Sequence, residues 1–422
     1  MNKLKIRQIF ECRICNEKKL NEIINLGSQP ISNQFISENN IKNIIFEKAP
    51  LVLIKCFNCG LVQLKHTVDK DQIYKEYWYR SGINQTMRDA LKDITIAAQK
   101  NINLDRDDII IDIGCNDGTL LNFFDSKKYK LIGFDPALNI SQKNENFLRI
   151  KNYFSFDAFN DLKLKNKAKL ITSIAMFYDL DNPNEFVKDI SLSLKDDGLW
   201  IIQIADLHTM IKGIMYDQII HEHLEFYHLK PLEYLFEKHN LKIYKIEKNT
   251  VNGSSYRIFV KKNIKSYVPD KSVDYFKEFE NKANLENAIT YIKFSQDVKD
   301  SKKKIKNIVK KINNENKVVF GLGASTKGNI ILNYCSFSEL EIPYIVDRNP
   351  FKKNCRAIGS NIPILTEDEA KKHKPDYYLL LPYFFQKEII SREKNFFING
   401  GKIIIPLPTI KIIDYNNFTE IC

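Results

Sequence analysis

The chain has 422 residues, of which 44% are hydrophobic, 12% aromatic and 27% charged. At roughly 150 residues per domain this length indicates two to three domains, and the composition excludes a disordered chain. Sixty-four Lys and Arg against 52 Asp and Glu give a net charge of +12, but the lysines are scattered, which argues against a nucleic-acid polymer and suits an anionic small molecule.

Membrane and export signals are absent from the sequence pattern. The longest apolar runs, such as Tyr377 to Phe385, are about half of the roughly 20 residues that a membrane helix needs. Residues 1–10 carry basic side chains without the apolar stretch of a secretory signal. We therefore expect a cytoplasmic protein with no membrane partner.

Four of the eight cysteines form two Cys-x-x-Cys pairs, which are Cys12 with Cys15 and Cys56 with Cys59. Two such knuckles supply the four thiolates of a structural zinc site, and no position then stays open for catalysis. The alternative is a set of unpaired or redox cysteines. The remaining cysteines show no pairing pattern and are expected to be ordinary thiols: Cys115, Cys335, Cys355 and Cys422.

A strand, a glycine-containing loop and a helix are predicted from Asp107 onward. Gly114 and Gly118 let the backbone pass close to a ligand, and Asp112 at the strand end can accept hydrogen bonds from a cationic group. A second strand ends in Asp135, where a carboxylate can chelate a ribose diol. A further strand over 168–176 supports a nucleotide-type site, with a plain tight turn as the alternative.

Two imidazoles and a carboxylate stand together in His221-Glu222-His223. The histidines are two residues apart, so they do not share a helix face as the zinc ligands of a zincin do. A mostly neutral imidazole can accept a proton while a carboxylate orients its other nitrogen. The alternative is a group of polar residues that opens a helix.

The last third begins with a Lys- and Glu-rich stretch over 261–315, whose apolar spacing predicts connecting helices. A strand over 317–320 then leads into Gly321-Leu-Gly-Ala-Ser-Thr-Lys-Gly328, and a helix is predicted from Asn329. The backbone amides, the helix start and Lys327 suit a pyrophosphate, although the spacing is not that of a nucleotide hydrolase. Strands over 344–346, 377–381 and 402–405 complete a small α/β layer. A purely structural glycine turn is the alternative.

These motifs resemble the S-adenosylmethionine-dependent C-methyltransferases that act on nucleotide-linked keto-deoxysugars. The Asp112 to Leu121 stretch is similar to the cofactor loop of class I methyltransferases and lacks the GxGxxG spacing of a dinucleotide site. The resemblance rests on an ordered set of motifs: the Cys-x-x-Cys pairs, Tyr77 to Arg88, His221 to His223, Gly321 to Gly328, Asp347-Arg348-Asn349-Pro350 and the closing Ile-Pro-Leu-Pro.

The resemblance implies an α/β chain in four parts: a zinc-binding lobe over 1–75, a class I methyltransferase Rossmann-like domain over 76–260, a helical connector over 261–315 and a C-terminal Rossmann-like lobe over 316–422. The implied cofactors are S-adenosylmethionine and a structural Zn²⁺, and the implied substrate is a nucleotide-sugar. Candidate cofactor-binding residues are Asp112, Gly114, Asn116, Asp117, Gly118 and Asp135. Candidate substrate-binding residues are Tyr77, Arg88, Gly323, Ser325, Lys327 and Arg348.

In the family, a carbonyl at C4 of the sugar acidifies the C3 proton, a base removes it, and the enolate carbon attacks the sulfonium methyl. The resemblance implies that His223 is the base and that Glu222 orients or supports it. Tyr79, with Tyr77 as second choice, would stabilise the enolate oxygen. His221 is a further catalytic candidate, and no catalytic metal is required.

Two positions depart from the family pattern. Ile220 stands where members often have a tyrosine, and Tyr178 stands where a histidine often follows the third strand. Tyr178 with Asp179 is a candidate replacement for the imidazole, and packing is the alternative for Tyr178. The rival interpretations are methylation at oxygen and a binding or scaffold protein with a degenerate methyltransferase fold.

Overall fold

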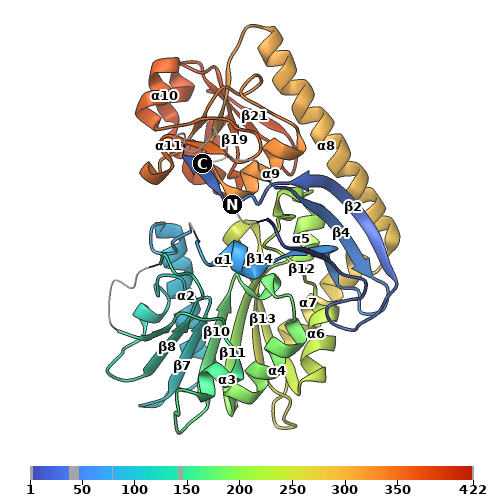
Figure 1. Cartoon of the computed structure of the whole chain (residues 1–422), viewed down its shortest axis with the longest axis vertical. Helices are drawn as coiled ribbons and strands as arrows, with labels where there is room; N and C mark the ends of the chain where they lie inside the picture. Colours follow the sequence, from blue (N-terminus) through green and yellow to red (C-terminus); the bar gives the residue numbers. More distant parts are fainter. Residues whose placement is uncertain (1–2, 38–46, 78, 141–145, 421–422) are drawn as a thin grey trace.

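The computed structural model describes residues 3–37, 47–77, 79–140 and 146–420. In Figure 1 a seven-stranded sheet lies at one end of the molecule and a six-stranded sheet at the other. The long helix α8 (Ala288–Asn314) runs along one side, next to strands β2 and β4 of a four-stranded N-terminal sheet. Trp78 and Cys422 lie outside the described residues.

The seven-stranded central sheet has the order β13-β14-β11-β10-β7-β8-β9. Its strands β7 to β11 are mutually parallel, and β14 runs antiparallel to both β11 and β13. Parallel strands are covered on both faces, which explains the unbroken apolar run of β7. The strands are β7 (Ile109–Ile113), β8 (Lys130–Phe134), β9 (Leu148–Ile150), β10 (Ala168–Ile174), β11 (Leu194–Ala205), β13 (Leu241–Asn249) and β14 (Ser255–Lys262).

Helices cover both faces of the central sheet. Helix α2 (Gln85–Asn101) is capped by Asn84 and packs Leu91 and Ile94 on the face that carries Ile110. Helices α4 (Pro183–Ser193) and α6 (Leu229–Lys238) bury Phe186 and Phe236 on the opposite face. The remaining helices of this region are α3 (Phe156–Asn160), α5 (Leu207–Lys212) and α7 (Lys271–Lys282).

The helix expected directly after the Gly114–Gly118 loop is not formed. The chain makes only a 3₁₀ turn over Leu121–Phe123 before it enters β8. Leu120, Leu121 and Phe124 are buried in one cluster, so the apolar spacing that predicted a helix serves a compact turn instead. The loop therefore has no helix N-terminus at its end, and its ligand-binding capacity rests on backbone and side chains.

The N-terminal lobe is built on the four-stranded sheet β12-β5-β4-β2. One of its strands, β12, comes from the middle of the chain and follows the His221-Glu222-His223 cluster directly. The strands are β2 (Leu20–Gln29), β4 (Ala49–Cys56), β5 (Val62–Leu64) and β12 (Glu225–Phe226). A small ribbon of β1 (Ile6–Gln8) and β6 (His66–Val68) and the helix α1 (Lys70–Tyr74) complete the lobe.

The C-terminal lobe is built on the six-stranded sheet β18-β16-β15-β19-β20-β21, which is parallel except for β21. The strands are β15 (Val319–Leu322), β16 (Ile345–Val346), β18 (Ile364–Leu365), β19 (Tyr377–Leu380), β20 (Lys402–Ile405) and β21 (Lys411–Ile413). Its helices are α9 (Thr326–Tyr334), α10 (Glu367–His373), α11 (Gln386–Arg392) and α12 (Lys394–Ile398). An antiparallel pair of β3 (Phe35–Ser37) and β17 (Cys355–Ala357) joins this lobe to the N-terminal one.

The expected connecting helices between residues 261 and 315 are present as α7 and α8. Helix α9 begins at Thr326 and not at Asn329, because the Ser325 hydroxyl accepts a 3.0 Å hydrogen bond from the Gly328 amide and caps the helix earlier.

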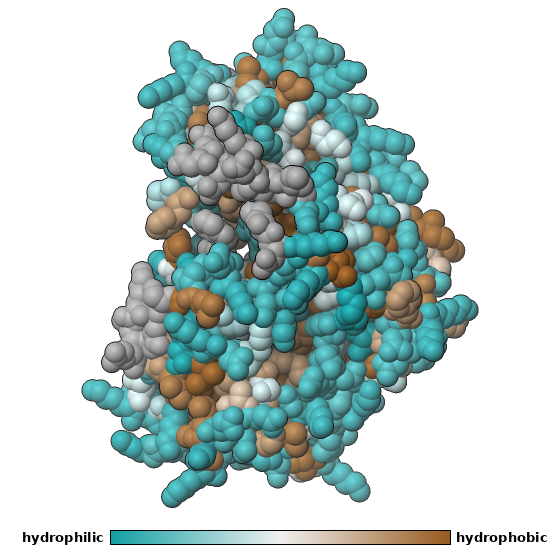
Figure 2. Space-filling model, in the orientation of Figure 1, coloured by the Kyte–Doolittle hydropathy of each residue, from teal (hydrophilic) through white to brown (hydrophobic). Residues whose placement is uncertain are grey.

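The surface of the molecule is mostly hydrophilic on the face shown in Figure 2, and hydrophobic side chains gather there only in separate small groups. Among the described residues no helix combines the length and apolar character needed to cross a bilayer.

Candidate active site

A cavity of about 1110 Å³ is lined by residues from the central domain, the N-terminal lobe and the C-terminal lobe. The central sheet contributes Asp112 and Gly114, the N-terminal lobe contributes Tyr74, and the C-terminal lobe contributes Lys327. Because the carboxyl ends of the parallel strands point into this space, the cavity lies where open α/β sheets bind their ligands.

The loop after β7 forms one wall of the cavity. Gly114 has a φ of +72°, and an added Cβ would lie 3.1 Å from Met176, so a side chain at this position would be strained and crowded. The Asp135 carboxylate holds the loop by accepting hydrogen bonds from the amides of Asn116 at 2.8 Å and Ala137 at 2.9 Å. Asp135 therefore shapes the loop as well as facing the cavity.

Two carboxyl groups at the strand ends are perturbed by burial. Burial raises the pKa of Asp112 to about 7, although its carboxylate accepts a 2.6 Å hydrogen bond from the Thr172 hydroxyl. Burial also raises the pKa of Asp135, and the nearby guanidinium of Arg149, at 3.5 Å, offsets part of that effect. Both groups line the cavity, where a ligand would supply further hydrogen-bond donors.

Residues 79–88 include a segment that is hydrogen-bonded to the loop. The Gly82 amide donates a 2.8 Å hydrogen bond to Asp117, and the Arg88 guanidinium donates to the Gly82 carbonyl at 2.6 Å. Tyr77, Tyr79 and Asn116 line the cavity, whereas Arg88, Asp117 and Gly118 are absent from its wall. Asp117 holds the segment against the loop, whereas Arg88 bonds within the segment. The expected contact of Arg88, Asp117 and Gly118 with substrate or cofactor remains a prediction.

His223 lines the cavity, and one of its two ring nitrogens is hydrogen-bonded to the protein. Its Nδ1 lies 3.0 Å from the Gln218 carbonyl oxygen, which can only accept a hydrogen bond. Burial, together with the positive charge of Lys327, lowers the pKa of His223 to about 3. The ring is therefore neutral with its proton on Nδ1, and Nε2, which bonds to no described residue, has a lone pair available to a bound molecule.

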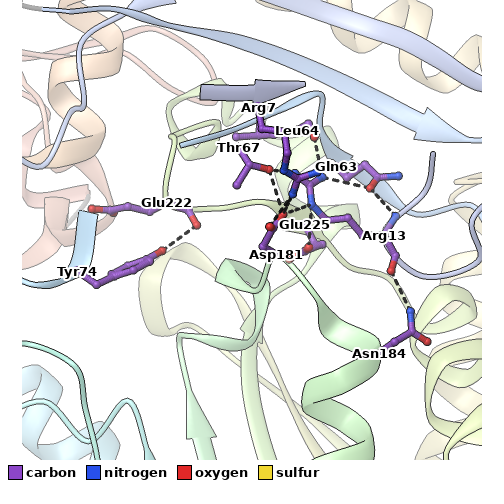
Figure 3. A network of polar contacts seen from close by, with 10 residues as sticks. All are labelled: Arg7, Arg13, Gln63, Leu64, Thr67, Tyr74, Asp181, Asn184, Glu222 and Glu225. Atoms are coloured by element: carbon purple, nitrogen blue, oxygen red, sulfur yellow. Dashed lines mark hydrogen bonds and ion pairs between the residues drawn. The ribbon is translucent and has the colours of Figure 1, made fainter. Parts of the chain in front are cut away.

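Among the described residues Glu222 makes no side-chain hydrogen bond to His223, and its expected role in orienting or supporting His223 remains a prediction. The orienting group is the Gln218 carbonyl, and the Glu222 side chain is instead hydrogen-bonded by Asn33. Burial raises the pKa of Glu222 to about 7. The backbone carbonyl of Glu222 accepts a 3.1 Å hydrogen bond from the Tyr74 hydroxyl, as Figure 3 shows.

The first histidine of the cluster has a different environment. The Nε2 of His221 lies 3.0 Å from the Ala49 carbonyl oxygen of the N-terminal lobe, and burial lowers the pKa of His221 to about 4. Its Nδ1 is buried and has no hydrogen-bond partner among the described residues. His221 thus joins the lobes and also borders the cavity.

The two positions that depart from the family pattern both border the cavity next to His223. The ring of Tyr178 packs edge-on against the imidazole, with 4.4 Å between ring centroids. Ile220 is 2% exposed and gives the wall an apolar surface at that point. Asp179, which follows Tyr178, also lines the cavity, and burial of its carboxyl group holds its pKa well above the usual range.

The glycine loop of the C-terminal lobe contributes one charged group to the cavity. Lys327 lines it and lies over the ring of Phe384, 4.3 Å from the centroid. Gly323, with a φ of +84°, and the helix cap Ser325 shape the loop without lining the cavity. Arg348 is 61% exposed in its side chain and faces Glu367 at 3.8 Å, away from the cavity wall.

The four expected metal ligands meet in one cluster at the base of the N-terminal lobe. The Sγ atoms of Cys12, Cys15, Cys56 and Cys59 all lie within 4.8 Å of one another, with Cys12 to Cys59 at 3.6 Å and Cys15 to Cys56 at 3.4 Å. Tetrahedral Zn–S bonds of about 2.3 Å require sulfur separations of about 3.8 Å, so these thiols fit one zinc ion. The other described cysteines, Cys115, Cys335 and Cys355, are buried elsewhere.

Solved methyltransferase structures resemble part of the chain. The plantazolicin methyltransferase BpumL matches with a TM-score of 0.35 and 14% identity over 43% of this chain and 87% of that one. A S-adenosylmethionine-dependent methyltransferase from Clostridium acetobutylicum matches with a TM-score of 0.31 and 12% identity over 43% of this chain and 94% of that one.

Three family models match in order along the chain. They describe a zinc binding domain over residues 12–74, a methyltransferase domain over 79–246 and a C-methyltransferase C-terminal domain over 250–408. The C-methyltransferase NovU from Streptomyces niveus is 27% identical over 97% of this chain and 98% of its own length. The chain belongs to the S-adenosylmethionine-dependent C-methyltransferases. The expected fold class, with a class I methyltransferase sheet between a zinc-binding lobe and a C-terminal α/β lobe, is confirmed.

The cavity of this C-methyltransferase suits its cofactor. The open backbone at Gly114 and the buried carboxyls of Asp112 and Asp135 offer close approach and hydrogen-bond acceptors at one end. The zinc ion of the family is structural, since four thiolates fill its coordination sphere and leave no position for a reacting group.

Several groups of the site could not be found from sequence motifs. The Gln218 carbonyl that orients His223 is a backbone atom, and backbone atoms carry no residue signature. Asn33 and Tyr74 reach Glu222 from about 150 or more residues away in the chain. For Lys327, the surrounding glycine loop predicted a ligand-binding role, but the sequence did not indicate that Lys327 lines the same cavity as His223.

Proposed function

We propose that this C-methyltransferase adds a methyl group to a carbon, C3, of a nucleotide-linked 4-keto-deoxysugar through an enolate, with His223 as the base. The observation that supports the proposal is the hydrogen-bonding state of the His223 imidazole. Its Nδ1–H is directed to the Gln218 carbonyl, and its Nε2 is left for the substrate in the same cavity as Gly114. A fixed tautomer with one free lone pair is what proton abstraction requires.

Bound S-adenosylmethionine supplies an activated methyl group, so the chain has to remove a proton, stabilise an oxyanion and align two carbons. His223 takes the C3 proton on Nε2, and the resulting imidazolium keeps its bond from Nδ1 to the Gln218 carbonyl. The new C–C bond forms as the C–S bond breaks. Tyr79, which is 46% exposed and borders the cavity, is the proposed donor to the enolate oxygen.

The nucleotide part of the substrate is assigned to the C-terminal lobe. Lys327 brings a positive charge into the cavity from the glycine loop, opposite in sign to a pyrophosphate. Burial and this charge together lower the pKa of His223 and keep it neutral, so Lys327 would serve both the anionic substrate and the base. Asp112, Gly114, Asn116 and Asp135 are proposed to hold the cofactor.

The test is methyl transfer from labelled S-adenosylmethionine to a panel of nucleotide-linked keto-sugars, with the labelled atom located by NMR. The proposal expects label on the carbon next to the carbonyl and none on oxygen. Transfer to a hydroxyl group, or no transfer while the cofactor still binds, would contradict it. A 4-hydroxy sugar of the same nucleotide is the matched control and should not react, because its C3 proton is not acidified.

A further inference from the structure

Arg13 stands between the zinc ligands Cys12 and Cys15, but its side chain leaves the metal site and enters the protein interior. The side chain is 2% exposed. Its Nη1 donates to the Leu64 carbonyl at 2.7 Å, and its Nη2 donates to the Thr67 hydroxyl at 2.7 Å. Figure 3 shows the guanidinium at the centre of this group of polar contacts.

Two carboxylates face the remaining nitrogen of the guanidinium. The Nε of Arg13 lies 3.6 Å from Glu225 Oε1 and 3.7 Å from Asp181 Oδ1. The Glu225 side chain is 0% exposed, and neither of its oxygens accepts a hydrogen bond from a described residue. Burial raises the pKa of Glu225 well above its usual range, and the positive charge of Arg13 is the largest effect that opposes this, so the charged form of Glu225 depends on Arg13.

Glu225 is the second residue after His223 and belongs to strand β12. This strand pairs Glu225 with Gln63 of the N-terminal sheet, and the Leu64 amide donates to the Leu224 carbonyl at 2.8 Å. The Leu224 amide in turn donates to the Tyr178 carbonyl at 2.8 Å. The segment that carries His223 is therefore held between the zinc-binding lobe and the turn that carries Tyr178.

The backbone of the first Cys-x-x-Cys pair, Cys12 to Cys15, is also hydrogen-bonded to the central domain. The Asn184 side chain donates to the carbonyls of Arg13 and Ile14, both at 2.9 Å. Since Asn184 belongs to α4 of the central layer, the position of the first knuckle is tied to the same helix layer that supports Tyr178.

We propose that Arg13 is a positioning residue for methyl transfer, which couples the zinc knuckle to the placement of His223 through the buried carboxylate of Glu225. The proposal rests on the proposed role of His223. Arg13 does not line the cavity itself, although its partners Thr67 and Asp181 do, and among the described residues it makes no hydrogen bond or ion pair with the Gly114–Gly118 loop. We therefore expect its loss to affect proton transfer more than cofactor binding.

The test compares Arg13→Met with Arg13→Met/Glu225→Gln in the zinc-loaded enzyme. Four quantities are measured: zinc content, cofactor Kd by calorimetry, exchange of the substrate C3 proton with deuterated solvent, and amide exchange over residues 221–227. Displacement of a reacting group by about 1 Å can cost about 100-fold in rate. We expect Arg13→Met to lose about that factor in proton exchange, with faster amide exchange over 221–227 and unchanged zinc content and Kd.

The double variant distinguishes positioning from general damage. Glu225→Gln removes the charge that Arg13→Met leaves uncompensated, so proton exchange should recover at least tenfold. Lys169→Met is the control, because Lys169 is a buried cation paired with Asp197 at 2.5 Å away from the cavity. It should leave proton exchange unchanged.

The proposal is overturned if Arg13→Met exchanges the substrate proton at the wild-type rate, or if its losses in proton exchange, zinc and cofactor binding are equal and the double variant does not recover. If Arg13→Met does not fold, Arg13→Lys is used. It keeps the charge next to Glu225 and loses the guanidinium fork, so we expect a loss in proton exchange smaller than about 100-fold with unchanged cofactor Kd. Equal losses in proton exchange, zinc content and cofactor binding in that variant also overturn the proposal. Failure of the wild-type enzyme itself to exchange the C3 proton would instead contradict the proposed function.

Discussion

The Tyr383 hydroxyl of the C-terminal lobe donates a 2.8 Å hydrogen bond to the buried carboxylate of Asp217. Burial raises the pKa of Asp217 to about 6, and the other carboxylate oxygen accepts no bond from a described residue. Asp217 immediately precedes Gln218, whose carbonyl orients His223. The C-terminal lobe therefore contacts the 3₁₀ turn Tyr216–Gln218, and this turn orients the proposed base. The same lobe also contributes Lys327 to the cavity wall.

Tyr383→Phe should weaken this support. Above pH 7 Asp217 is ionised, and loss of a hydrogen bond to a charged group costs about 1.5 to 3 kcal/mol of unfolding free energy. We expect that loss in urea unfolding and a fall of about tenfold in methylation rate, with unchanged cofactor Kd. Tyr344→Phe, in the same lobe with its ring against Phe320, is the control. A stable Tyr383→Phe enzyme of full activity would exclude a role for the contact.

His223→Ala should abolish exchange of the substrate proton, since general-base assistance is typically worth about 10²- to 10⁴-fold. Cofactor affinity should stay nearly constant because the loop around Gly114 is untouched. His221→Ala should affect exchange less, because its Nε2 is used at the Ala49 carbonyl. His373→Ala, beside Tyr344, is the distant control. If His221→Ala or Tyr178→Phe stops exchange while His223→Ala does not, the base has been assigned to the wrong residue.

Asp135→Ala should weaken cofactor binding by roughly tenfold or more, which corresponds to one charge-assisted hydrogen bond. The structure adds a second cause, since the carboxylate also holds the amides of Asn116 and Ala137 in the loop. Calorimetry with S-adenosylmethionine measures the effect, and Asp161→Ala, an exposed carboxylate of the same domain, is the control. Equal affinities in the two variants would place the cofactor elsewhere.

Zinc removal should unfold the N-terminal lobe, because the binding free energy of a structural zinc is also folding free energy. Elemental analysis of protein purified without chelators should give one zinc ion per chain. Cys56→Ser should lose it, whereas Cys335→Ser, at a buried thiol of the C-terminal lobe, should retain it. Protein free of metal with its N-terminal lobe folded would show that the four thiols serve another purpose.

Glu222 should make stability depend on pH. Its pKa is about 7 in the folded chain against a usual value of 4.5, so the native state binds more protons than the unfolded state between these values. Its contribution is fully present below pH 4.5 and is lost as the pH rises through 7. Glu222→Gln should remove this contribution to the pH dependence of the unfolding free energy. In urea unfolding, the variant should gain stability relative to wild type from pH 5 to pH 8. Parallel pH curves for the two proteins would show that the carboxyl is not perturbed.

The zinc ligands and the cofactor loop could be predicted from the sequence because their chemistry is local. Two Cys-x-x-Cys pairs and a strand that ends in Gly114 carry their geometry within a few residues, and the structure brings the four thiols together as expected. The parallel core was equally readable, since strands buried on both faces leave unbroken apolar runs such as Ile109–Ile113.

What only the tertiary structure decided is how the proposed catalytic group is held. The apolar spacing after Gly118 indicated a helix, but burial of Leu121 in the core favoured a 3₁₀ turn. The sequence predicted that Glu222 orients or supports His223, and only the folded chain shows that a backbone carbonyl bonds to the His223 ring. The contacts of Tyr383 with Asp217 and of Arg13 with Glu225 join residues 166 and more than 200 positions apart. Local spacing cannot encode such pairs, because their proximity arises only when the sheets pack and bury both partners away from water.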